Sequence, residues 1–507
     1  MERATIHRHI YLVLLALLGG SMVTSVWLSN LVWVLLLVNW LVEGRWREKW
    51  QMACESRLLQ AFLILYLTFI IGMAWTSNLG HGLSVLQVKM PLLFVPLVLL
   101  TTRPVTGRAR HLILNFYVLT VLVVSIIGLV RMLTIPDLPY REMVPYVSHI
   151  RFALNCCMVI FLCVGLVVQR KQGTPVPQSI IGCMVLLWML AFVMLLHSYT
   201  AVAVLAIVSL VVLLTHYRRW PLIALWVLLA GGASAAVLHE VHNYYSLIPQ
   251  ATAPLRTYTD GNRPYMHAQD GMVENGNYIN NYLCPEELSA EWEKRSTMAY
   301  DSMTNEGYTV GSTLIRYLNA LGLTKDSVGV HALTAEQVHD IEQGVANPVY
   351  HSHNPLRRMV YVMLLEHEFH KHTHSINGFT MLQRYELWGT SIDVIREHPW
   401  FGVGTGDVDD QIDLQLVLRQ SDLAGSGKRS HNQYLGLLAA FGIVGFLLLT
   451  AIFIRPLRKS SALRSPLMLA WMLTILISML TEDTLDTLAG QLLCTWFLAF
   501  RPLPDKQ

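Results

Sequence analysis

Residues 432–454 read NQYLGLLAAFGIVGFLLLTAIFI and contain no charged side chain. A helix needs roughly 20 apolar residues to cross the hydrocarbon core of a bilayer, so this segment is long enough to span a membrane. Eleven other segments have a comparable character, and the sequence therefore predicts an all-α polytopic membrane protein with about 12 transmembrane helices. The other predicted spans are residues 8–24, 26–42, 58–76, 85–101, 111–130, 150–168, 179–196, 200–215, 221–238, 466–480 and 485–500.

The composition of the whole chain agrees with this class. Of its 507 residues, 53% are hydrophobic and 14% are charged, whereas a soluble protein carries about 25% charged residues. These values exclude a disordered chain and a coiled coil. Seven cysteines over this length are too few for a disulfide-stapled secreted scaffold.

The first two predicted spans are short and follow one another closely. We place the break between them at Gly19, Gly20 and Ser21. Arg3 and Arg8 would also suit the charged start of a signal peptide. No clean small-x-small cleavage site follows the first span, which favours an uncleaved helix.

Positively charged residues predict the orientation, because they concentrate in cytoplasmic loops. If both termini are cytoplasmic, the segments on that side carry nineteen lysines and arginines, whereas the short outer loops carry only Arg131 and Arg141. The nineteen are Arg3, Arg8, Arg45, Arg47, Lys49, Arg57, Arg103, Arg108, Arg110, Arg170, Lys171, Arg218, Arg219, Arg455, Arg458, Lys459, Arg464, Arg501 and Lys506. We therefore expect both termini in the cytoplasm.

Residues 239–430 form one long polar segment between the ninth and tenth predicted spans. The segment holds 24 of the 34 acidic residues and 14 of the basic ones, a formal charge of −10. A structureless connection of this length would be unusual, so we expect an outward-facing loop domain that is mostly helical and partly irregular. The predicted regions are an N-terminal membrane domain over residues 1–238, this loop domain over 239–430, and a C-terminal membrane domain over 431–507 with a short cytoplasmic tail.

Five cationic side chains lie in or beside predicted spans at the outer membrane boundary. They come from four places in the chain and are Lys89, Arg131, Arg151, Lys428 and Arg429. Each of them, taken alone, is explained by snorkelling, in which a long side chain extends its charge to the lipid headgroups. Ionisable groups within spans are costly and mark function by default. As a set, these cations suit an anionic group such as a pyrophosphate.

Residues 380–411, TMLQRYELWGTSIDVIREHPWFGVGTGDVDDQ, predict an amphipathic helix that Pro399 ends. Arg384 lies beside its apolar stripe, which is formed by Leu382, Tyr385, Trp388, Ile392 and Ile395. The following glycines at 402, 404 and 406 predict a turn. A dinucleotide fingerprint would need a preceding strand and a different spacing.

Residues 428–445, KRSHNQYLGLLAAFGIVG, place His431 and Asn432 at the start of the tenth span. A histidine at a helix start is often a cap or an interface residue. Here it lies at the same membrane depth as the five cations, and an imidazole can exchange a proton near neutral pH. We therefore treat His431 as a candidate acid–base residue.

The pair EHPWFGVGTGD (397–407) and SHNQYLGLLAAFGIVGF (430–446) resembles the signature of the O-antigen ligase and polymerase superfamily. The topology is also similar, with about twelve spans and one large periplasmic loop late in the chain. The resemblance implies a GT-C-like glycosyltransferase of the bacterial inner membrane. Such an enzyme takes a glycan from undecaprenyl pyrophosphate on the periplasmic face and needs no metal or cofactor.

The resemblance also implies roles for two residues. His431 matches the family's histidine and would accept or orient the proton of the acceptor hydroxyl. Arg384 matches the family's loop arginine, which precedes a tryptophan, and would stabilise the leaving pyrophosphate. An inverting single displacement is expected.

Other residues are candidates for binding rather than for chemistry. We expect Arg151, Lys89 and Arg429 to bind the pyrophosphate. The family's second arginine follows a serine at the outer start of the eighth span, where this chain has Tyr199. Possible substrate contacts are Tyr199, Asn432 and Tyr434. Aromatic residues near the outer face could stack on sugar rings or belong to the interfacial belt, namely Tyr244, Tyr245, Trp388, Trp400 and Tyr434.

Several alternatives stay open. The acceptor could be another glycan, lipid A-core or a protein, which would make the enzyme a polymerase, a ligase or a protein O-oligosaccharyltransferase. A polysaccharide transporter would show internal repeats, and none is visible. A zinc enzyme is suggested by His351, His353, His367, His370, His372 and His374. However, residues 367–370 are one residue short of the His-Glu-x-x-His spacing. The expected partners are the lipid-linked donor, the acceptor and the bilayer, and no nucleic acid.

Overall fold

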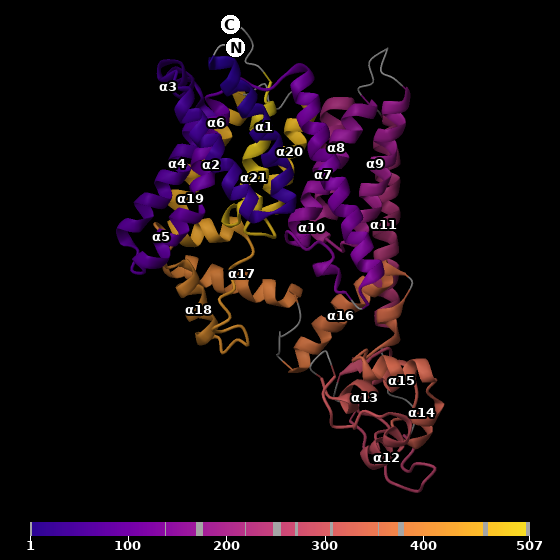
Figure 1. Cartoon of the computed structure of the whole chain (residues 1–507). Coiled ribbons are helices and arrows are strands. Elements are labelled where there is room, and N and C mark those ends of the chain that lie inside the picture. Colours follow the sequence, from indigo (N-terminus) through magenta and orange to yellow (C-terminus); the bar gives the residue numbers. More distant parts are fainter. Residues whose placement is uncertain are drawn as a thin grey trace. The chain divides into compact units, whose positions relative to one another are not determined.

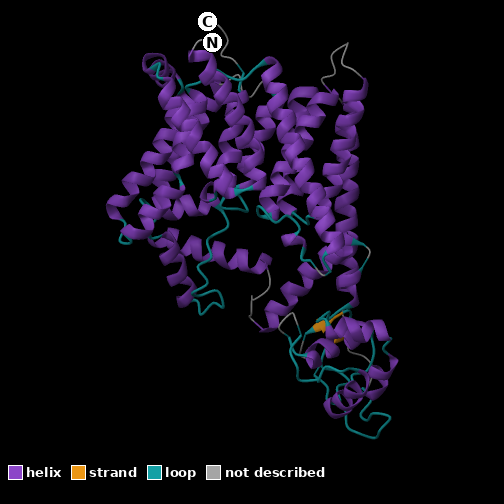
Figure 2. Ribbon diagram, in the orientation of Figure 1, coloured by secondary structure: helices purple, strands orange, loops and turns teal. Residues whose placement is uncertain are grey.

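The computed structural model of the protein describes residues 3–136, 138–168, 176–218, 220–246, 255–268, 272–304, 308–352, 354–373, 380–459 and 465–502. These residues are mostly helical (Figure 2). They divide into two compact units. We call Met1–Trp226 with Arg384–Gln507 the membrane unit, and Val227–Gln383 the loop unit. The boundary at Arg384 divides the predicted loop domain between the two units.

The membrane unit contains both long and short helices, and the following are the long ones. They are α1 (Arg3–Thr24), α2 (Val26–Glu43), α3 (Trp46–Glu55), α4 (Arg57–Gly72), α5 (Leu79–Val88), α6 (Met90–Leu100), α7 (Gly107–Thr134), α8 (His149–Val168), α9 (Val176–Leu195), α10 (Tyr199–Val212), the first part of α11 (Trp220–Ser246), most of α17 (Thr380–Glu397), α18 (Val408–Leu418), α19 (Gln433–Lys459), α20 (Pro466–Ser478) and α21 (Leu488–Trp496). The short ones are η1 (Met73–Trp75), η2 (Tyr140–Glu142), η3 (Leu213–Tyr217), η6 (Thr484–Asp486) and η7 (Phe497–Phe500).

The prediction of an all-α polytopic membrane protein is confirmed. Among the described residues, 9 helices are long and apolar enough to cross a membrane. Three shorter apolar helices are Ile180–Leu195, Pro466–Ser478 and Leu488–Phe500. Each of the twelve segments predicted from hydropathy overlaps one of these helices. The fourth span is broken, because α5 ends and α6 begins on either side of Lys89.

The break between the first two spans does not lie at Gly19. Instead, α1 continues to Thr24, and the Ser25 side chain caps α2. A Cβ atom at Gly19 would lie 2.4 Å from the ring of Trp496. This glycine therefore allows the fully buried indole of Trp496 to approach α1, and the indole nitrogen donates to the Leu15 carbonyl (2.8 Å). In Figure 1, α1, α2, α6 and α21 lie side by side, and α1 packs directly against α21.

The start of α1 and the end of η7 meet at one face of the membrane unit. Arg8 donates to the Arg103 carbonyl (3.2 Å), and Arg501 donates to the carbonyls of Leu99 (2.8 Å) and Thr102 (3.0 Å). Both ends of the unit therefore lie beside the loop between α6 and α7. An even number of crossings gives this arrangement.

The apolar stripe predicted for residues 380–397 is not the buried face of α17. Leu387 and Val394 are fully buried, together with Thr390 and Ser391, whereas Tyr385 is 57% exposed. The face that contacts the protein is therefore mixed in polarity. The exposed apolar side chains resemble those on the outside of the membrane spans, where lipid is the expected neighbour.

The loop unit has a small core of its own. Its elements are the second part of α11, β1 (Val273–Glu274), β2 (Asn277–Tyr278), α12 (Pro285–Arg295), α13 (Val310–Ala320), α14 (Ser327–Ala332), α15 (Ala335–Glu342), η4 (Pro348–His351), α16 (Pro355–Thr373) and the start of α17. Trp292, Leu314, Leu318 and Ile341 are fully buried at the centre.

Candidate active site

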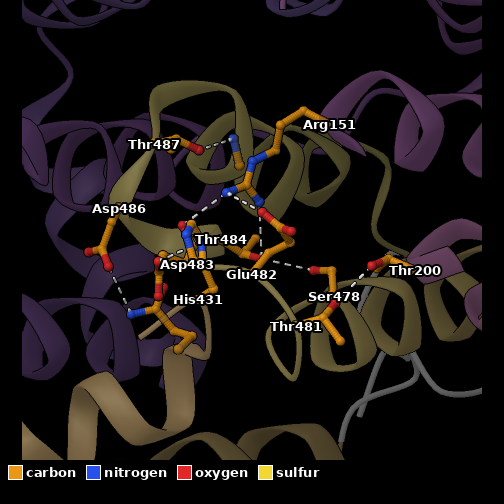
Figure 3. Close-up of polar contacts among 12 residues, drawn as sticks. Arg151, Thr200, His431, Ser478, Thr481, Glu482, Asp483, Thr484, Asp486 and Thr487 are labelled. Carbon is orange, nitrogen blue, oxygen red and sulfur yellow. Dashed lines mark hydrogen bonds and ion pairs between the residues drawn. The ribbon is translucent and has the colours of Figure 1, made fainter. Parts of the chain in front are cut away.

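A short loop with three carboxylates joins α20 to α21. We call residues 481–486, Thr-Glu-Asp-Thr-Leu-Asp, the acidic loop. Glu482 is 7% exposed and Asp483 is 8% exposed. Buried charges are stable only when they are paired or hydrogen-bonded. Figure 3 shows the side chains that gather around this loop.

Glu482 contacts two arginines that come from distant parts of the sequence. Its Oε1 accepts a hydrogen bond from Nη2 of Arg384 (2.7 Å), and its Oε2 lies 3.7 Å from Nη2 of Arg151. Arg151 also donates to the Thr484 hydroxyl (3.3 Å) and to the Asp483 carbonyl (3.1 Å). One carboxylate therefore holds two guanidinium groups together, one from the start of α8 and one from α17.

His431 faces the next residue of the loop. Its Nδ1 lies 3.6 Å from Oδ2 of Asp483, and the Ser430 hydroxyl donates to Oδ1 of the same carboxylate (3.3 Å). The side chain of Asn432 accepts from the backbone of Tyr434 (3.0 Å) and so caps α19. His431 itself has φ +49°, a left-handed conformation that costs a residue with a side chain roughly 1–2 kcal/mol. The Ser-His-Asn motif thus fixes the histidine against the acidic loop.

The local environment shifts the pKa values of this pair. Burial lowers the pKa of His431 below its ordinary 6.5, Glu482 opposes this shift, and Arg384 adds to it. Burial raises the pKa of Asp483 to about 7, and repulsion from Asp486 and Glu482 adds to the increase. At neutral pH the imidazole is therefore mostly neutral and able to accept a proton.

Lys89 forms a buried ion pair with the last carboxylate of the loop. Its ammonium group pairs with Asp486 and lies 4.4 Å from the centre of the Phe69 ring. Gln433 supports the same region, because its side-chain oxygen accepts from the Leu485 backbone (2.7 Å). Lys89 is 2% exposed. It therefore ties the break between α5 and α6 to the acidic loop.

Arg429 lies at the edge of the site. It donates to Asp409 (3.1 Å), which also lies 3.3 Å from His81. Arg429, Lys89 and Asp483 line a small cavity of about 150 Å³. The structure thus brings Arg429 and Lys89 to one side of the acidic loop. Arg131, in contrast, donates to the Glu142 carbonyl (3.4 Å), and within the described part of the chain it forms no hydrogen bond or ion pair with that loop.

The remaining predicted contacts have different surroundings. Tyr199 is 50% exposed and begins α10. The next residue, Thr200, shares a hydrogen bond with Thr481 of the acidic loop (2.9 Å). Tyr434 donates to the Leu476 carbonyl (2.8 Å), which joins α19 to α20. Tyr199, where the resemblance implies a second arginine, therefore directly precedes a residue that contacts the acidic loop.

The glycine-rich segment before α18 forms a tight turn against α19, in agreement with the predicted turn. The backbone of Val403 donates to Ala439 (2.9 Å), and the backbone of Gly404 donates to Ala440 (2.9 Å). Gly404 has φ +95°, and a Cβ atom there would lie 2.5 Å from the Thr76 hydroxyl. These glycines are required for close backbone packing.

The same turn provides hydrogen-bond partners for backbone groups at a break inside α19. Gly442 has φ +62° and interrupts the helix. Beyond the break, the backbone of Ile443 donates to Pro399 (2.8 Å), and the backbone of Val444 donates to Trp400 (3.2 Å). Together with the bonds to Ala439 and Ala440, these contacts satisfy both sides of the interruption.

Among the described residues, no group of three or more His, Cys, Asp or Glu side chains is placed to hold a metal ion. Of the histidines in the zinc alternative, His353 and His374 lie outside the described residues. The side chain of His372 lies outside them as well. His367 and His370 lie on α16.

The reasoning from sequence missed the acidic loop. Its signal was present, because Glu482, Asp483 and Asp486 are three acidic residues in a short loop between two apolar spans. Only the cations near the membrane boundary stood out as candidates from the sequence. The partners of those cations were therefore not predicted.

Residues 352–450 match the model of a family described as O-antigen ligase. The match includes Arg384, the glycine-rich turn and His431, and it confirms the superfamily that the sequence motif resembled. Arg151, Lys89 and the acidic loop lie outside the matched O-antigen ligase segment. A comparison with curated proteins finds no match for this chain.

Proposed function

We propose that the protein transfers a glycan from undecaprenyl pyrophosphate to an acceptor hydroxyl at the periplasmic face of the bacterial inner membrane. One observation carries the proposal: Arg384 contacts Glu482, and His431 contacts Asp483, the next residue of the acidic loop. Both residues lie within the O-antigen ligase segment. A cation for the leaving group and a base for the acceptor are the two groups that this transfer needs.

The arginines supply the stabilisation of the leaving pyrophosphate. As the glycosidic bond breaks, negative charge develops on the phosphate oxygens, and fixed cations in a poorly hydrated site stabilise that charge strongly. Arg384 and Arg151 share Glu482 in the resting site. The pyrophosphate therefore has to replace Glu482 as their partner. Planar guanidinium groups suit this exchange because each can donate two parallel hydrogen bonds to an oxyanion.

His431 supplies the proton acceptor. The acceptor hydroxyl loses its proton as it attacks the anomeric carbon, and a neutral imidazole accepts it. Asp483, 3.6 Å away, then faces the imidazolium and stabilises its charge. The direct displacement inverts the anomeric centre. The proton and the leaving group are thus handled by side chains of this chain alone.

Deletion of the gene, followed by gel analysis of surface glycans, tests the reaction and separates its variants. Loss of glycan from lipid A-core or from protein, with accumulation of lipid-linked polymer, identifies a ligase or a protein O-oligosaccharyltransferase. Loss of the polymer itself identifies a polymerase. An unchanged glycan profile contradicts the proposal.

Alanine variants then test the two residues. We expect Arg384→Ala and His431→Ala, produced at normal abundance, to abolish transfer. Arg396→Ala and His398→Ala are matched controls, because Arg396 is a 76% exposed arginine on the same helix as Arg384 and His398 is an exposed histidine of the matched segment. Wild-type transfer by either test variant excludes the catalytic role of that residue.

The orientation in the membrane is tested independently of the chemistry. In a variant without native cysteines, single cysteines placed in α12 should react with an impermeant label in intact cells. Single cysteines placed in α3 should react only after lysis. The opposite pattern would place the acidic loop in the cytoplasm and contradict the periplasmic site.

A further inference from the structure

The loop unit contains a cavity of about 610 Å³ that takes no part in the proposed chemistry. The end of α11, the β1–β2 hairpin, the end of α13, η4 and α16 supply its walls. Its volume lies in the range of about 300–1,000 Å³ that is typical of small-molecule sites. The cavity is formed entirely within residues 240–368 of the loop unit.

Three tyrosines form an aromatic wall of this cavity. Tyr244 contacts Tyr245 and Tyr361, with ring centroids 5.4 Å apart in both pairs and the rings nearly perpendicular. Tyr245 is 39% exposed, so it is open to a ligand. Perpendicular rings expose both faces and edges. Such a wall suits a ligand that has flat C–H surfaces and polar edges.

The hairpin and α16 bring fixed polar groups to the same cavity. Asn275 and Gly276 both have positive φ (+51° and +80°), as a two-residue type I′ turn requires. Asn347 donates to the buried carboxylate of Glu274 (2.8 Å) and to the hydroxyl of Tyr361 (2.8 Å). These groups are held in place by hydrogen bonds to one another.

Other polar side chains of the lining have unused hydrogen-bonding capacity. In the described part of the chain, no hydrogen bond or ion pair is found for the side chains of Glu240, Asn243 or Arg357. The Tyr244 hydroxyl is also buried without a partner among the described residues. A carboxylate, an amide and a guanidinium together can both donate to and accept from adjacent hydroxyl groups.

The lining has no excess of positive charge to bind a strongly anionic ligand. Glu240 and Glu368 face a single cation, Arg357. Lys371 outside the lining compensates Glu368 (2.8 Å), and Arg316 compensates the buried Glu274. A pyrophosphate would meet one arginine here, whose charge Glu240 balances, whereas Arg384, Arg151 and Lys89 converge at the acidic loop. The two sites therefore differ in the ligands that they suit.

We propose that this cavity binds a neutral saccharide. A pyranose ring has C–H faces for the tyrosines and hydroxyl groups for Glu240, Asn243 and Arg357. The identity of that saccharide, as either the transferred glycan or the acceptor, rests on the proposed function. The binding itself does not, because it depends only on side chains of the loop unit.

Titration of saccharides into the full-length protein in lipid nanodiscs tests the proposal. The probes are chitotriose as a neutral saccharide, trigalacturonate as an acidic one, the glycan released from the lipid by mild acid, and an uncharged oligosaccharide fragment of the acceptor. We expect at least one neutral probe to bind and trigalacturonate to bind more weakly than chitotriose. A preference between the last two probes identifies the source of the natural ligand.

Variants of the lining decide whether the cavity is the binding site. Tyr245→Ala and Asn243→Ala should each weaken binding about tenfold, as the loss of an aromatic contact or a hydrogen bond implies. Tyr258→Ala is the matched control, because this tyrosine is 54% exposed and lies in the loop unit outside the lining. Absence of any saccharide binding, or equal affinity in Tyr245→Ala, Asn243→Ala and the wild type, overturns the proposal.

His431→Ala separates this proposal from the proposed function. It should lose transfer and keep saccharide binding. If it keeps transfer while the lining variants weaken binding, the mechanism is wrong and the saccharide site stands. If transfer depends on His431 but the lining variants bind normally, only the saccharide site is wrong.

Discussion

Replacing Glu482 by glutamine should strengthen pyrophosphate binding while it lowers the stability of the protein. The carboxylate is the resting partner of Arg384 and Arg151, at 2.7 Å and 3.7 Å. In Glu482→Gln, the incoming pyrophosphate no longer competes with a negative charge. Glutamine keeps a carbonyl oxygen in nearly the same place. The substitution therefore changes charge more than shape.

The magnitude follows from the burial of the ion pair. The Arg384 side chain is 14% exposed and that of Glu482 is 9% exposed. Two unit charges 4 Å apart interact by about 4 kcal/mol at an effective dielectric constant of about 20. Allowing for residual hydration, we expect a gain of about 1.4–2.8 kcal/mol, or roughly tenfold to a hundredfold in affinity. Removing one partner of a buried ion pair costs about 3–5 kcal/mol, and less where glutamine still accepts a hydrogen bond.

Calorimetric titration of inorganic pyrophosphate into the protein in nanodiscs measures the affinity, and a thermal melt measures the stability. Glu386→Gln is the matched control, because Glu386 lies on the same helix as Arg384 and pairs with Arg419 (3.3 Å) outside the acidic loop. The reasoning is refuted if Glu482→Gln binds pyrophosphate no more tightly than the wild type. A similar gain in pyrophosphate affinity in Glu386→Gln would show that the effect arises from the change in net charge alone.

Three further outcomes are expected. Arg384→Lys should retain more transfer activity than Arg384→Ala and less than the wild type, in an in vitro assay, because an ammonium cannot donate two parallel hydrogen bonds. The pKa of Asp483 is raised to about 7, so its stabilising contribution is complete below its ordinary pKa of 3.8 and is lost as the pH rises through about 7. The melting temperature of the wild type should therefore fall more between pH 5 and pH 8 than that of Asp483→Asn. An equal pH dependence of the two proteins would contradict this. Gly404→Ala should lower the melting temperature more than Gly425→Ala. Both positions have positive φ, but only a Cβ atom at Gly404 meets a neighbour, the Thr76 hydroxyl at 2.5 Å. Equal losses in melting temperature would mean that backbone strain alone matters.

Most of the membrane topology was predictable because it depends on local composition. A lipid-spanning helix requires about 20 apolar residues in a row, and that requirement is visible in any window of the sequence. The details that depend on packing were not predictable. Gly19 looks like a helix break by propensity, yet it lies inside α1 because Trp496 packs against it. On α17, Leu387 and Val394 are buried although the more apolar stripe lies on another face.

The candidate site was predictable in part for the same reason. His431 and Arg384 could be identified because they belong to a motif that is continuous in sequence. The cations Lys89 and Arg151 were noticeable as charges in apolar surroundings. Glu482 was not identified, because its importance arises only when α8 and α17 bring Arg151 and Arg384 to the same carboxylate. Nothing in the local sequence of the loop reports that convergence.

The interruption of α19 at Gly442 has a consequence for how the protein is made. Hydrocarbon offers no hydrogen bonds, so the freed backbone groups of this span need partners at the moment of insertion. Residues 399–404, which supply those partners, precede α19 in the chain and leave the ribosome first. The turn can therefore meet the helix as the helix enters the membrane. The order of synthesis thus lowers the cost of inserting a broken span, because its partners are already present. A rearranged chain that produced α19 before this turn would lose that advantage.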